Sequence, residues 1–246
     1  PTPAKSLMPC LHWPSKALPS SNTCSSKPWP LPKPHCTAMK IVLASNNAGK
    51  LAELQELFGT LGVTLITQGT LGIPEAPEPH HTFLENALAK ARHASAHSGL
   101  PAIADDAGLC VDAFGGLPGV QTAYYATQFG LPKGDDNNVK TLLEQMQGIT
   151  QRRAALVCTL VAVRNPQDPE PLVATGRATG EITRQPIGSN GFGFDPVLYL
   201  PALGKTFAEL PPAEKNRLSH RGQAAAAMLQ LLRTNWLPAA ASTTSS

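Results

Sequence analysis

The chain has 246 residues, which is long enough for one large domain or two small ones. Hydrophobic residues make up 42% of it, which is enough for a sizeable core. Its net charge of +3 comes from residues 1–38, which carry four lysines and no acid, whereas the remainder has 16 basic and 17 acidic residues. This balance argues against nucleic acid as a partner, and no apolar run reaches the roughly 20 residues of a membrane span.

Residues 1–38 contain nine of the 24 prolines and no periodic apolar pattern, so we expect a disordered leader. They lack the features of a signal or transit peptide, and Met39 directly precedes the first predicted strand, which suggests that the natural start lies there. Residues 238–246 are expected to be a disordered tail, which leaves 39–237 as the folded domain. None of the five cysteines has metal-ligand spacing. Cys110 and Cys158 lie in apolar, strand-like runs, so we expect reduced core thiols, which fits a reducing, cytoplasmic compartment.

Predicted strands and helices alternate between the two tails. Thr82 with Glu85 is the signature of a capping box at the start of a helix, and Gly99 is a typical C-terminal signal for the same helix. The alternation predicts an α/β fold with a mixed sheet flanked by helices. Strands are expected at 40–45, 63–67, 102–104, 109–114, 153–164 and 171–184, and helices at 48–61, 82–99, 135–147 and 219–236.

A small polar turn separates the first strand from the first helix. Free N–H groups and the helix dipole favour an anion at a helix N-terminus, and Lys50 adds a positive charge, so the turn predicts a phosphate site. It is not a Walker loop, because that motif requires Gly at the position of Ala44 and Ser or Thr at that of Leu51. An ordinary α/β connection is the alternative. The turn consists of Ser45, Asn46, Asn47, Ala48, Gly49 and Lys50.

Asp105 and Asp106 stand together at the end of a short apolar strand that is expected to be internal. Adjacent acids often cap a turn in water, which is the alternative interpretation. Unpaired charge beside an inner strand is costly, however, and Mg²⁺ held by one or two carboxylates and by phosphate oxygens would offset that cost. Glu78 and Glu85 are further carboxylate candidates, and Lys90 could face the same anion.

Two further clusters could complete a site. Glycines flank aromatic rings in the segment 188–196, where open ring faces could stack on a flat base, with an aromatic corner packed in the core as the alternative. Near the start of the last helix, Lys215, His220 and Arg221 could donate hydrogen bonds to a carbonyl oxygen or could simply be solvated.

Together these segments resemble the Ham1 family of inosine/xanthosine triphosphate pyrophosphatases over about residues 39–237. The resemblance implies a homodimer of two-lobed subunits, each with a long mixed sheet and a central nucleotide cleft. It also implies Mg²⁺-dependent hydrolysis of dITP, ITP or XTP to the monophosphate and pyrophosphate. The matching segments are the turn 45–50, Thr82-Phe83-Leu84-Glu85-Asn86-Ala87, Ala102-Ile103-Ala104-Asp105-Asp106, Gly191-Phe192-Gly193-Phe194-Asp195-Pro196 and Ser219-His220-Arg221-Gly222.

The resemblance also implies roles for individual residues. Asp106, beside Asp105, would be the general base and a metal ligand, and Glu78 falls at the position of a second metal ligand. The turn 45–50 would hold the phosphates, and Lys50 and Lys90 would balance charge on the leaving pyrophosphate. The base and sugar would be held by Phe192, Gly193, Phe194 and Asp195, and the purine edge by Lys215, His220 and Arg221.

Two single residues and one loop depart from the family pattern. Ala107 stands in the substrate site where Ser is usual, Tyr124 stands where Arg is expected, and residues 78–81 replace a Glu-Thr-Gly type loop. Loss of a hydroxyl from a phosphate contact would weaken binding by about 1.5–3 kcal/mol. Two rival functions stay open. Ala107 and Tyr124 suggest a catalytically weakened nucleotide-binding member, and a related Maf-type pyrophosphatase would share the architecture but explains the His220-Arg221 motif poorly. Adjacent His80 and His81 also suggest a transition metal, but no third ligand is suitably spaced.

Overall fold

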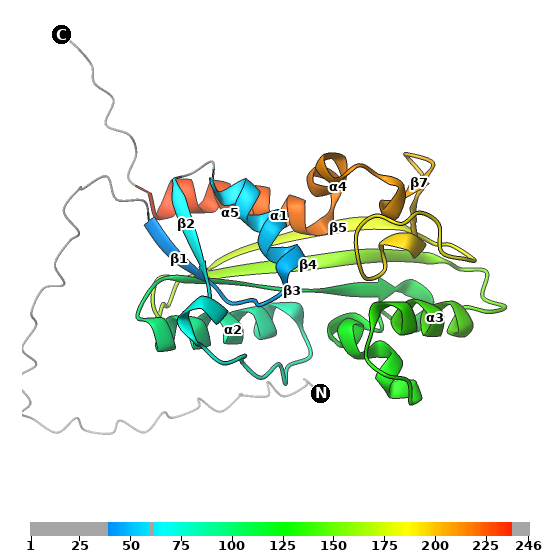
Figure 1. The fold of residues 1–246 in the computed structure, drawn as a ribbon, viewed down its shortest axis with the longest axis horizontal. Helices are drawn as coiled ribbons and strands as arrows, with labels where there is room; N and C mark the ends of the chain where they lie inside the picture. Colours follow the sequence, from blue (N-terminus) through cyan, green and yellow to red (C-terminus); the bar gives the residue numbers. More distant parts are fainter. Residues whose placement is uncertain (1–38, 60–61, 238–246) are drawn as a thin grey trace, which may run out of the picture. The chain divides into compact units, whose positions relative to one another are not determined.

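The computed structural model describes residues 39–59 and 62–237, so the predicted leader at 1–38 and tail at 238–246 lie outside the described residues. Within this part of the chain, seven strands form one sheet in the order β2-β1-β3-β4-β5-β6-β7 (Figure 1). β1 runs parallel to β2 and β3, and the other neighbours are antiparallel, which confirms the mixed sheet. The strands are β1 Met39–Leu43, β2 Val63–Thr67, β3 Ala102–Val111, β4 Arg153–Val163, β5 Leu172–Ile182, β6 Leu198–Leu200 and β7 Lys205–Thr206.

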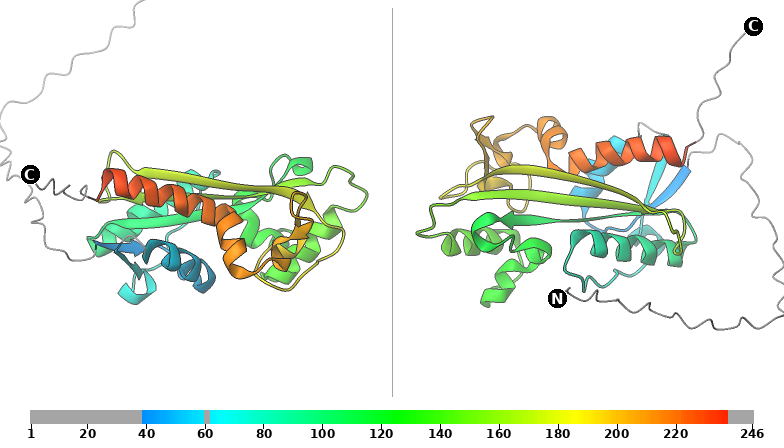
Figure 2. Two further views of the ribbon diagram at one scale, coloured as in Figure 1. Left: turned by 90° about the horizontal axis from the view of Figure 1, so that it is seen from above. Right: turned by 180° about the vertical axis from the view of Figure 1, so that it is seen from behind.

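Helices cover both faces of this sheet. Figure 2 shows α5 lying along one face of the long strands β4 and β5, with α2 against the opposite face. The short helix α4 and the 3₁₀ segment η3 (Gly119–Phe129) were not expected from the sequence. The α-helices are α1 Ala48–Gly59, α2 Phe83–Ser98, α3 Asp135–Gln145, α4 Pro212–Leu218 and α5 His220–Asn235.

Alternation along the strands divides the core between the two faces. Ile41 and Ile103 pack with Leu54 of α1 and Met228 of α5 on one face. On the other face, the small side chains of Ala87, Ala91 and Ala94 bring α2 close to β1, β3 and β4. A third cluster packs against α3. It joins the C-terminal parts of β3 and β5 and the N-terminal part of β4 with the segment 194–210.

The strand β3 corrects one expectation. The two short strands expected at 102–104 and 109–114 form a single strand that continues through the acidic pair. Asp105 lies opposite Leu160 and Asp106 opposite Thr159 in the ladder with β4, so the expectation that the acids end a strand is wrong. The charges break the apolar pattern, but ion pairs with helix residues offset the cost of burying them, and the ladder remains unbroken.

Helix α2 begins and ends as the sequence predicted. The backbone N–H of Glu85 donates to Oγ1 of the N-cap residue Thr82 at 3.2 Å. Gly99 ends the helix with a left-handed φ of 68°, which favours glycine. These caps fix the register of the face that carries Asn86 and Lys90. Among the described helices, none is both long and apolar enough to cross a membrane.

Candidate active site

The polar turn after β1 forms a capped helix start. Oδ1 of Asn47 accepts a hydrogen bond from the backbone N–H of Lys50 at 3.1 Å, and Oγ of Ser45 accepts one from the N–H of Asn47 at 3.2 Å. The helix N-terminus therefore points into the site with Lys50 beside it, as an anion site requires. Ala48 and Gly49 belong to the first turn of α1, and the side chain of Ala48 lies outside the described part of the chain.

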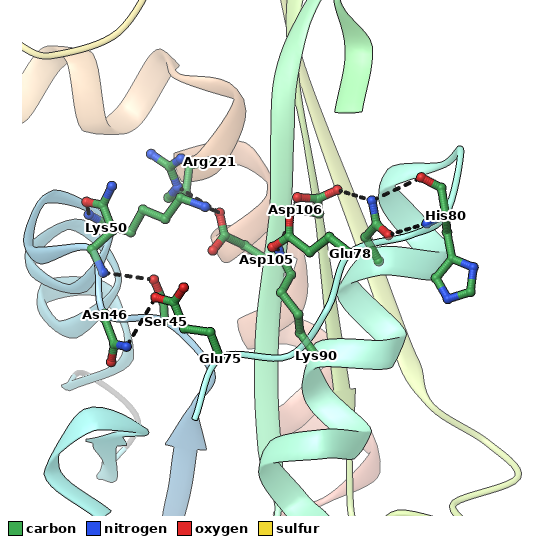
Figure 3. A network of polar contacts seen from close by, with 12 residues as sticks. Ser45, Asn46, Lys50, Glu75, Glu78, His80, Lys90, Asp105, Asp106 and Arg221 are labelled. Atoms are coloured by element: carbon green, nitrogen blue, oxygen red, sulfur yellow. Dashed lines mark hydrogen bonds and ion pairs between the residues drawn. The ribbon is translucent and has the colours of Figure 1, made fainter. Parts of the chain in front are cut away.

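Asn46 has a different environment from the rest of the turn. Its side-chain amide donates to Oε1 of Glu75 at 3.3 Å, so it ties the turn to the loop before α2 (Figure 3). Glu75 is a carboxylate that the sequence analysis did not single out. It follows a run without periodic pattern, so only its place in the folded loop reveals it.

Asp105 is completely buried on the face of β3 that meets α1 and α5. Nζ of Lys50 lies 2.9 Å and Nε of Arg221 lies 3.4 Å from the same oxygen, Oδ2 (Figure 3). Burial raises the pKa of Asp105, but the charges of Lys50, Arg221 and Lys90 outweigh burial and hold the pKa well below its usual range. Asp105 is therefore an ionised group that links two helix starts.

Asp106 points to the opposite face, toward α2. Its Oδ1 lies 3.1 Å from Nζ of Lys90, which also contacts Oε1 of Glu78 at 2.9 Å. Burial, together with the carboxylate of Glu78, raises the pKa of Asp106 above its usual value, although Lys90 and Asn86 act in the other direction. A raised pKa makes this carboxylate a stronger base than an exposed Asp.

Lys90 remains charged in this setting. Burial lowers its pKa, but the carboxylates of Asp106, Asp105 and Glu78 outweigh burial and raise it. The expected role of Glu85 as a further carboxylate finds no support in the geometry. Glu85 is exposed and accepts the hydroxyl of Thr82 at 2.6 Å, so it caps its own helix instead of facing the other acids.

Asn86 is a site residue that sequence reasoning missed. It is buried, and its Nδ2 donates to Oδ2 of Asp106 at 3.2 Å. The same side chain accepts from the N–H of His80 at 3.0 Å and donates to its carbonyl oxygen at 3.4 Å. Asn86 therefore holds Asp106 and the loop carrying Glu78 together. Its spacing of four residues from Lys90, which puts both on one helix face, was the available signal.

The donor set near Asp106 fits a hard cation. Glu78 and Asp106 already share one ammonium group, and Mg²⁺ needs only one or two carboxylates beside water and substrate oxygens. Within the described ranges, no group of three or more His, Cys, Asp or Glu is arranged to hold a metal. The transition-metal interpretation of His80 and His81 therefore gains no third ligand, and Figure 3 shows the His80 ring directed away from Asp106.

A polar cavity of about 440 Å³ lies between the turn after β1 and the loop 75–78, with Lys90 of α2 in its wall. Next to it, a second cavity of about 180 Å³ lies between the loop 188–196, which carries Phe192 and Phe194, and the start of α5. Lys50 lines both, so the two form neighbouring parts of one site. The first cavity is also lined by Ser45, Glu75, Glu78, Lys90, Asp105 and Tyr124. The second cavity is also lined by Asn47, Ala107, Phe192, Gly193, Phe194, Asp195, Lys215, His220 and Arg221.

The two aromatic residues of the loop differ. Phe194 is 3% exposed and belongs to the core, as the packed alternative expected, whereas Phe192 is 36% exposed. Nζ of Lys215 lies 4.6 Å and Cζ of Arg221 lies 5.6 Å from the Phe192 ring centroid. Asp195 accepts from Lys215 at 2.8 Å and from the N–H of Phe192 at 2.9 Å. These contacts leave an open ring beside two cations.

His220 begins α5 in a buried position. Oγ of Ser219 caps the helix by accepting from the N–H of Gly222 at 3.0 Å. Gly176 of β5 lets this helix start lie against the sheet, because a Cβ there would collide with the carbonyl oxygen of His220. Burial, with the charge of Arg221, lowers the pKa of His220 to about 3, so the ring is neutral. Its Nδ1 is buried and has no partner in the described part of the chain.

Comparisons with known proteins agree with this geometry. The model of the Ham1 family matches residues 41–231. The dITP/XTP pyrophosphatase of Albidiferax ferrireducens is 73% identical over 199 residues, which cover 81% of this chain and 100% of that protein. The dITP/XTP pyrophosphatase of Acidovorax sp. (strain JS42) is 72% identical over 198 residues, which cover 80% of this chain and 97% of that protein. Among solved structures, a HAM1 protein from Coxiella burnetii has 43% sequence identity to this chain and superposes with a TM-score of 0.75. The match covers 80% of this chain and 99% of that protein's chain.

Proposed function

The chain belongs to the Ham1 family, and on that premise we propose that it is a pyrophosphatase for non-canonical purine nucleoside triphosphates. The substrates would be dITP, ITP and XTP, and the products the monophosphate and pyrophosphate. One observation carries the proposal. Lys50 lines both a cavity rich in carboxylates and lysines and a cavity lined by an open aromatic ring and a His–Arg pair, so a triphosphate and its base would each meet matching chemistry.

The proposed step is attack of water at the α-phosphorus. The water oxygen forms the new P–O bond, the bond to pyrophosphate breaks, and the carboxylate of Asp106 takes the proton. Its burial and raised pKa support this role. Lys90 and Asn86 each contact one oxygen of Asp106 and so fix the orientation of the carboxylate. Asp105 is ionised and ion-paired, so its proposed part is to position Lys50 and Arg221.

The phosphates are proposed to lie at the start of α1. A helix N-terminus favours an anion, and Lys50 adds positive charge beside this one, where Asn47 caps the N–H of Lys50. Lys50 and Lys90 would stabilise negative charge that grows on the leaving pyrophosphate. Asn46 supports the turn through Glu75 and has no proposed contact with the phosphates.

The purine is proposed to occupy the second cavity. The base would stack on the open face of Phe192, with Asp195 and Lys215 holding the loop. Arg221 and a neutral His220 would donate hydrogen bonds to a 6-oxo group. A 6-amino group would instead set donor against donor and leave buried groups unpaired, which is how such a site rejects adenine.

The cofactor is proposed to be Mg²⁺, held by Asp106 and Glu78 with oxygens of the substrate. When bound, it would lower the pKa of the attacking water and screen charge on the triphosphate. The oxygen donors that surround Lys90 support this choice over a softer metal. Removal of Mg²⁺ with EDTA should stop turnover, and added Mg²⁺ should restore it.

Three further proposals concern the whole protein. We propose residues 39–237 as the catalytic domain, and a homodimer, which the resemblance to the Ham1 family implies. Cytoplasmic location is proposed because Cys110 and Cys158 are free thiols, as a reducing compartment maintains them. Light scattering on the purified protein would measure the oligomeric state directly.

The deciding experiment is a substrate panel. Purified protein with Mg²⁺ is given dITP, ITP, XTP, dATP and dCTP, and both pyrophosphate and orthophosphate are measured. We expect pyrophosphate and monophosphate from the three 6-oxo purine nucleotides, at far higher rates than from dATP or dCTP. Release of orthophosphate would instead identify a phosphatase, and a preference for pyrimidine nucleotides would favour the Maf-type alternative.

A further inference from the structure

The loop at 188–195 carries the open aromatic ring of the second cavity, yet its backbone is rich in glycine. Gly188, Gly191 and Gly193 have φ values of 84°, 80° and 62°, in the left-handed region that favours glycine. Glycines contribute no side-chain packing, so hydrogen bonds from neighbouring elements must fix where the loop places Phe192.

Two sides of the cavity supply such bonds. From α4, Lys215 contacts Oδ2 of Asp195, which also accepts the N–H of Phe192. From α3, Oδ2 of Asp135 accepts a hydrogen bond from the backbone N–H of Gly193 at 2.8 Å. The loop is therefore held from two elements that lie far apart in the sequence.

The α3 side is itself fixed to the cavity wall. Asp135 is in the first turn of α3, and Asn138, one turn further, is buried. Oδ1 of Asn138 accepts from the N–H of Ala126 at 2.8 Å, and its Nδ2 donates to the carbonyl oxygen of Ala123 at 3.3 Å. Asp135 and Asn138 line the same cavity as Phe192. The bond from Asp135 thus connects the loop to a helix that is itself hydrogen-bonded to the wall of the cavity.

We propose that Asp135 is a positioning residue for purine binding. Its carboxylate holds the backbone of Gly193 and thereby keeps the ring of Phe192 in place at the second cavity. The inference rests on the proposed function, because it requires a purine at that ring. A hydrogen bond to a carboxylate is among the stronger kinds in proteins, so its loss should release the loop measurably.

A residue that positions Phe192 and a residue that recognises the 6-oxo group of the purine should have different effects when they are lost. Stacking on Phe192 does not distinguish one purine from another, because every base offers a flat face. Loss of Asp135 should therefore weaken the binding of dITP and the binding of dATP by the same factor. Loss of a residue that reads the 6-oxo group should change the ratio between them.

The test compares Asp135→Ala, Asp135→Asn and Asp136→Ala with the wild type. Asp136 is the neighbouring acid in the first turn of α3, is exposed, and controls for the loss of negative charge at this helix start. For Asp135→Ala we expect KM for dITP and for dATP to rise about tenfold with kcat within about twofold of wild type. Asp135→Asn retains an acceptor oxygen and should recover most of the affinity.

Two measurements without turnover accompany the kinetics. Calorimetric affinity for IMP should fall about tenfold in Asp135→Ala, and amide hydrogen exchange at Gly193 should accelerate in that variant only. Thermal unfolding shows whether each variant is folded. If Asp135→Ala does not fold, Asp135→Glu replaces it, because it keeps the charge but displaces the carboxylate by one methylene.

The outcomes are distinct. Unchanged IMP affinity and unchanged Gly193 exchange in a folded Asp135→Ala, or in Asp135→Glu as its replacement, would overturn the role of Asp135 alone. An altered ratio of dITP to dATP would show that Asp135 reads the base and would also overturn it. Wild-type protein that binds no purine nucleotide would overturn the proposed function together with this role.

Discussion

Lys50 and Arg221, which lie at the starts of α1 and α5, contact the same carboxylate oxygen, Oδ2 of Asp105. One buried anion thus holds a residue proposed to bind phosphate and a residue proposed to read the base. Since both cations approach from one face of β3, the acid is the point at which the two helix starts meet the sheet.

Asp105→Asn should therefore destabilise the fold. The change leaves two cations facing a neutral group in a buried place, and breaking a buried ion pair in this way typically costs about 3–5 kcal/mol. Urea unfolding at neutral pH measures the loss. Asp112→Asn is the matched control, because Asp112 is exposed and its carboxylate lies 3.5 Å from exposed Arg153, so we expect a change of at most about 1 kcal/mol. Equal stabilities for the two variants would contradict the assigned role of the buried pair.

Asp106→Asn should lower kcat for dITP by about 10²–10⁴-fold, because the amide cannot accept the proton of the attacking water. The released pyrophosphate is measured with Mg²⁺ present, and circular dichroism confirms the fold. Glu85→Gln is the control, since that carboxylate caps the same helix that carries Lys90 but does not contact Asp106. A wild-type rate in Asp106→Asn would remove Asp106 as the base.

His220→Ala should reduce the preference for dITP over dATP by at least about tenfold, with a smaller effect on the rate for dATP. A buried donor that is lost no longer penalises the amino group of adenine. The ratio of kcat/KM values is the measurement, with Arg217→Ala, an exposed cation on α4, as the control. An unchanged ratio would show that the purine edge is read elsewhere.

Ala107→Ser should strengthen dITP binding about tenfold. Ala107 lines the second cavity together with Asn47 and Lys50 at the start of α1, where the phosphates are proposed to lie, so an added hydroxyl would gain a hydrogen bond to a charged phosphate. Binding to a non-hydrolysable dITP analogue and turnover are both measured. A wild-type protein that binds the analogue but shows no turnover, with activity appearing only in Ala107→Ser, would identify it as a catalytically weakened member of the family.

The stability of the protein should fall as the pH drops below 6.5, in part because of His220. Burial lowers its pKa in the folded protein from 6.5 to about 3, so the unfolded chain binds the extra proton between these pH values and gains stability from it. His220→Gln removes this contribution, and its unfolding free energy should depend less on pH by up to about 1.4 kcal/mol per unit. Parallel pH profiles from urea unfolding of the two proteins would contradict a neutral, buried His220.

Local patterns predicted much of the fold. The apolar runs gave β1, β4 and β5 to within about two residues at each end, and the capping residues gave α2. The 3₁₀ segment η3 and the short helix α4 carry no comparable local signal, since tertiary packing forms them. The motifs also identified most residues that line the two cavities, because each motif is short and lies at the end of an element.

Sequence alone therefore determined the alternating α/β elements, the helix start near Lys50 and the presence of two adjacent acids. Tertiary structure alone decided that β3 runs unbroken through Asp105 and Asp106 and turns them to opposite faces. The partners that make this possible come from α1, α2 and α5, which are far apart along the chain. Local patterns cannot register such partners, whereas the cost of a buried charge depends on them entirely.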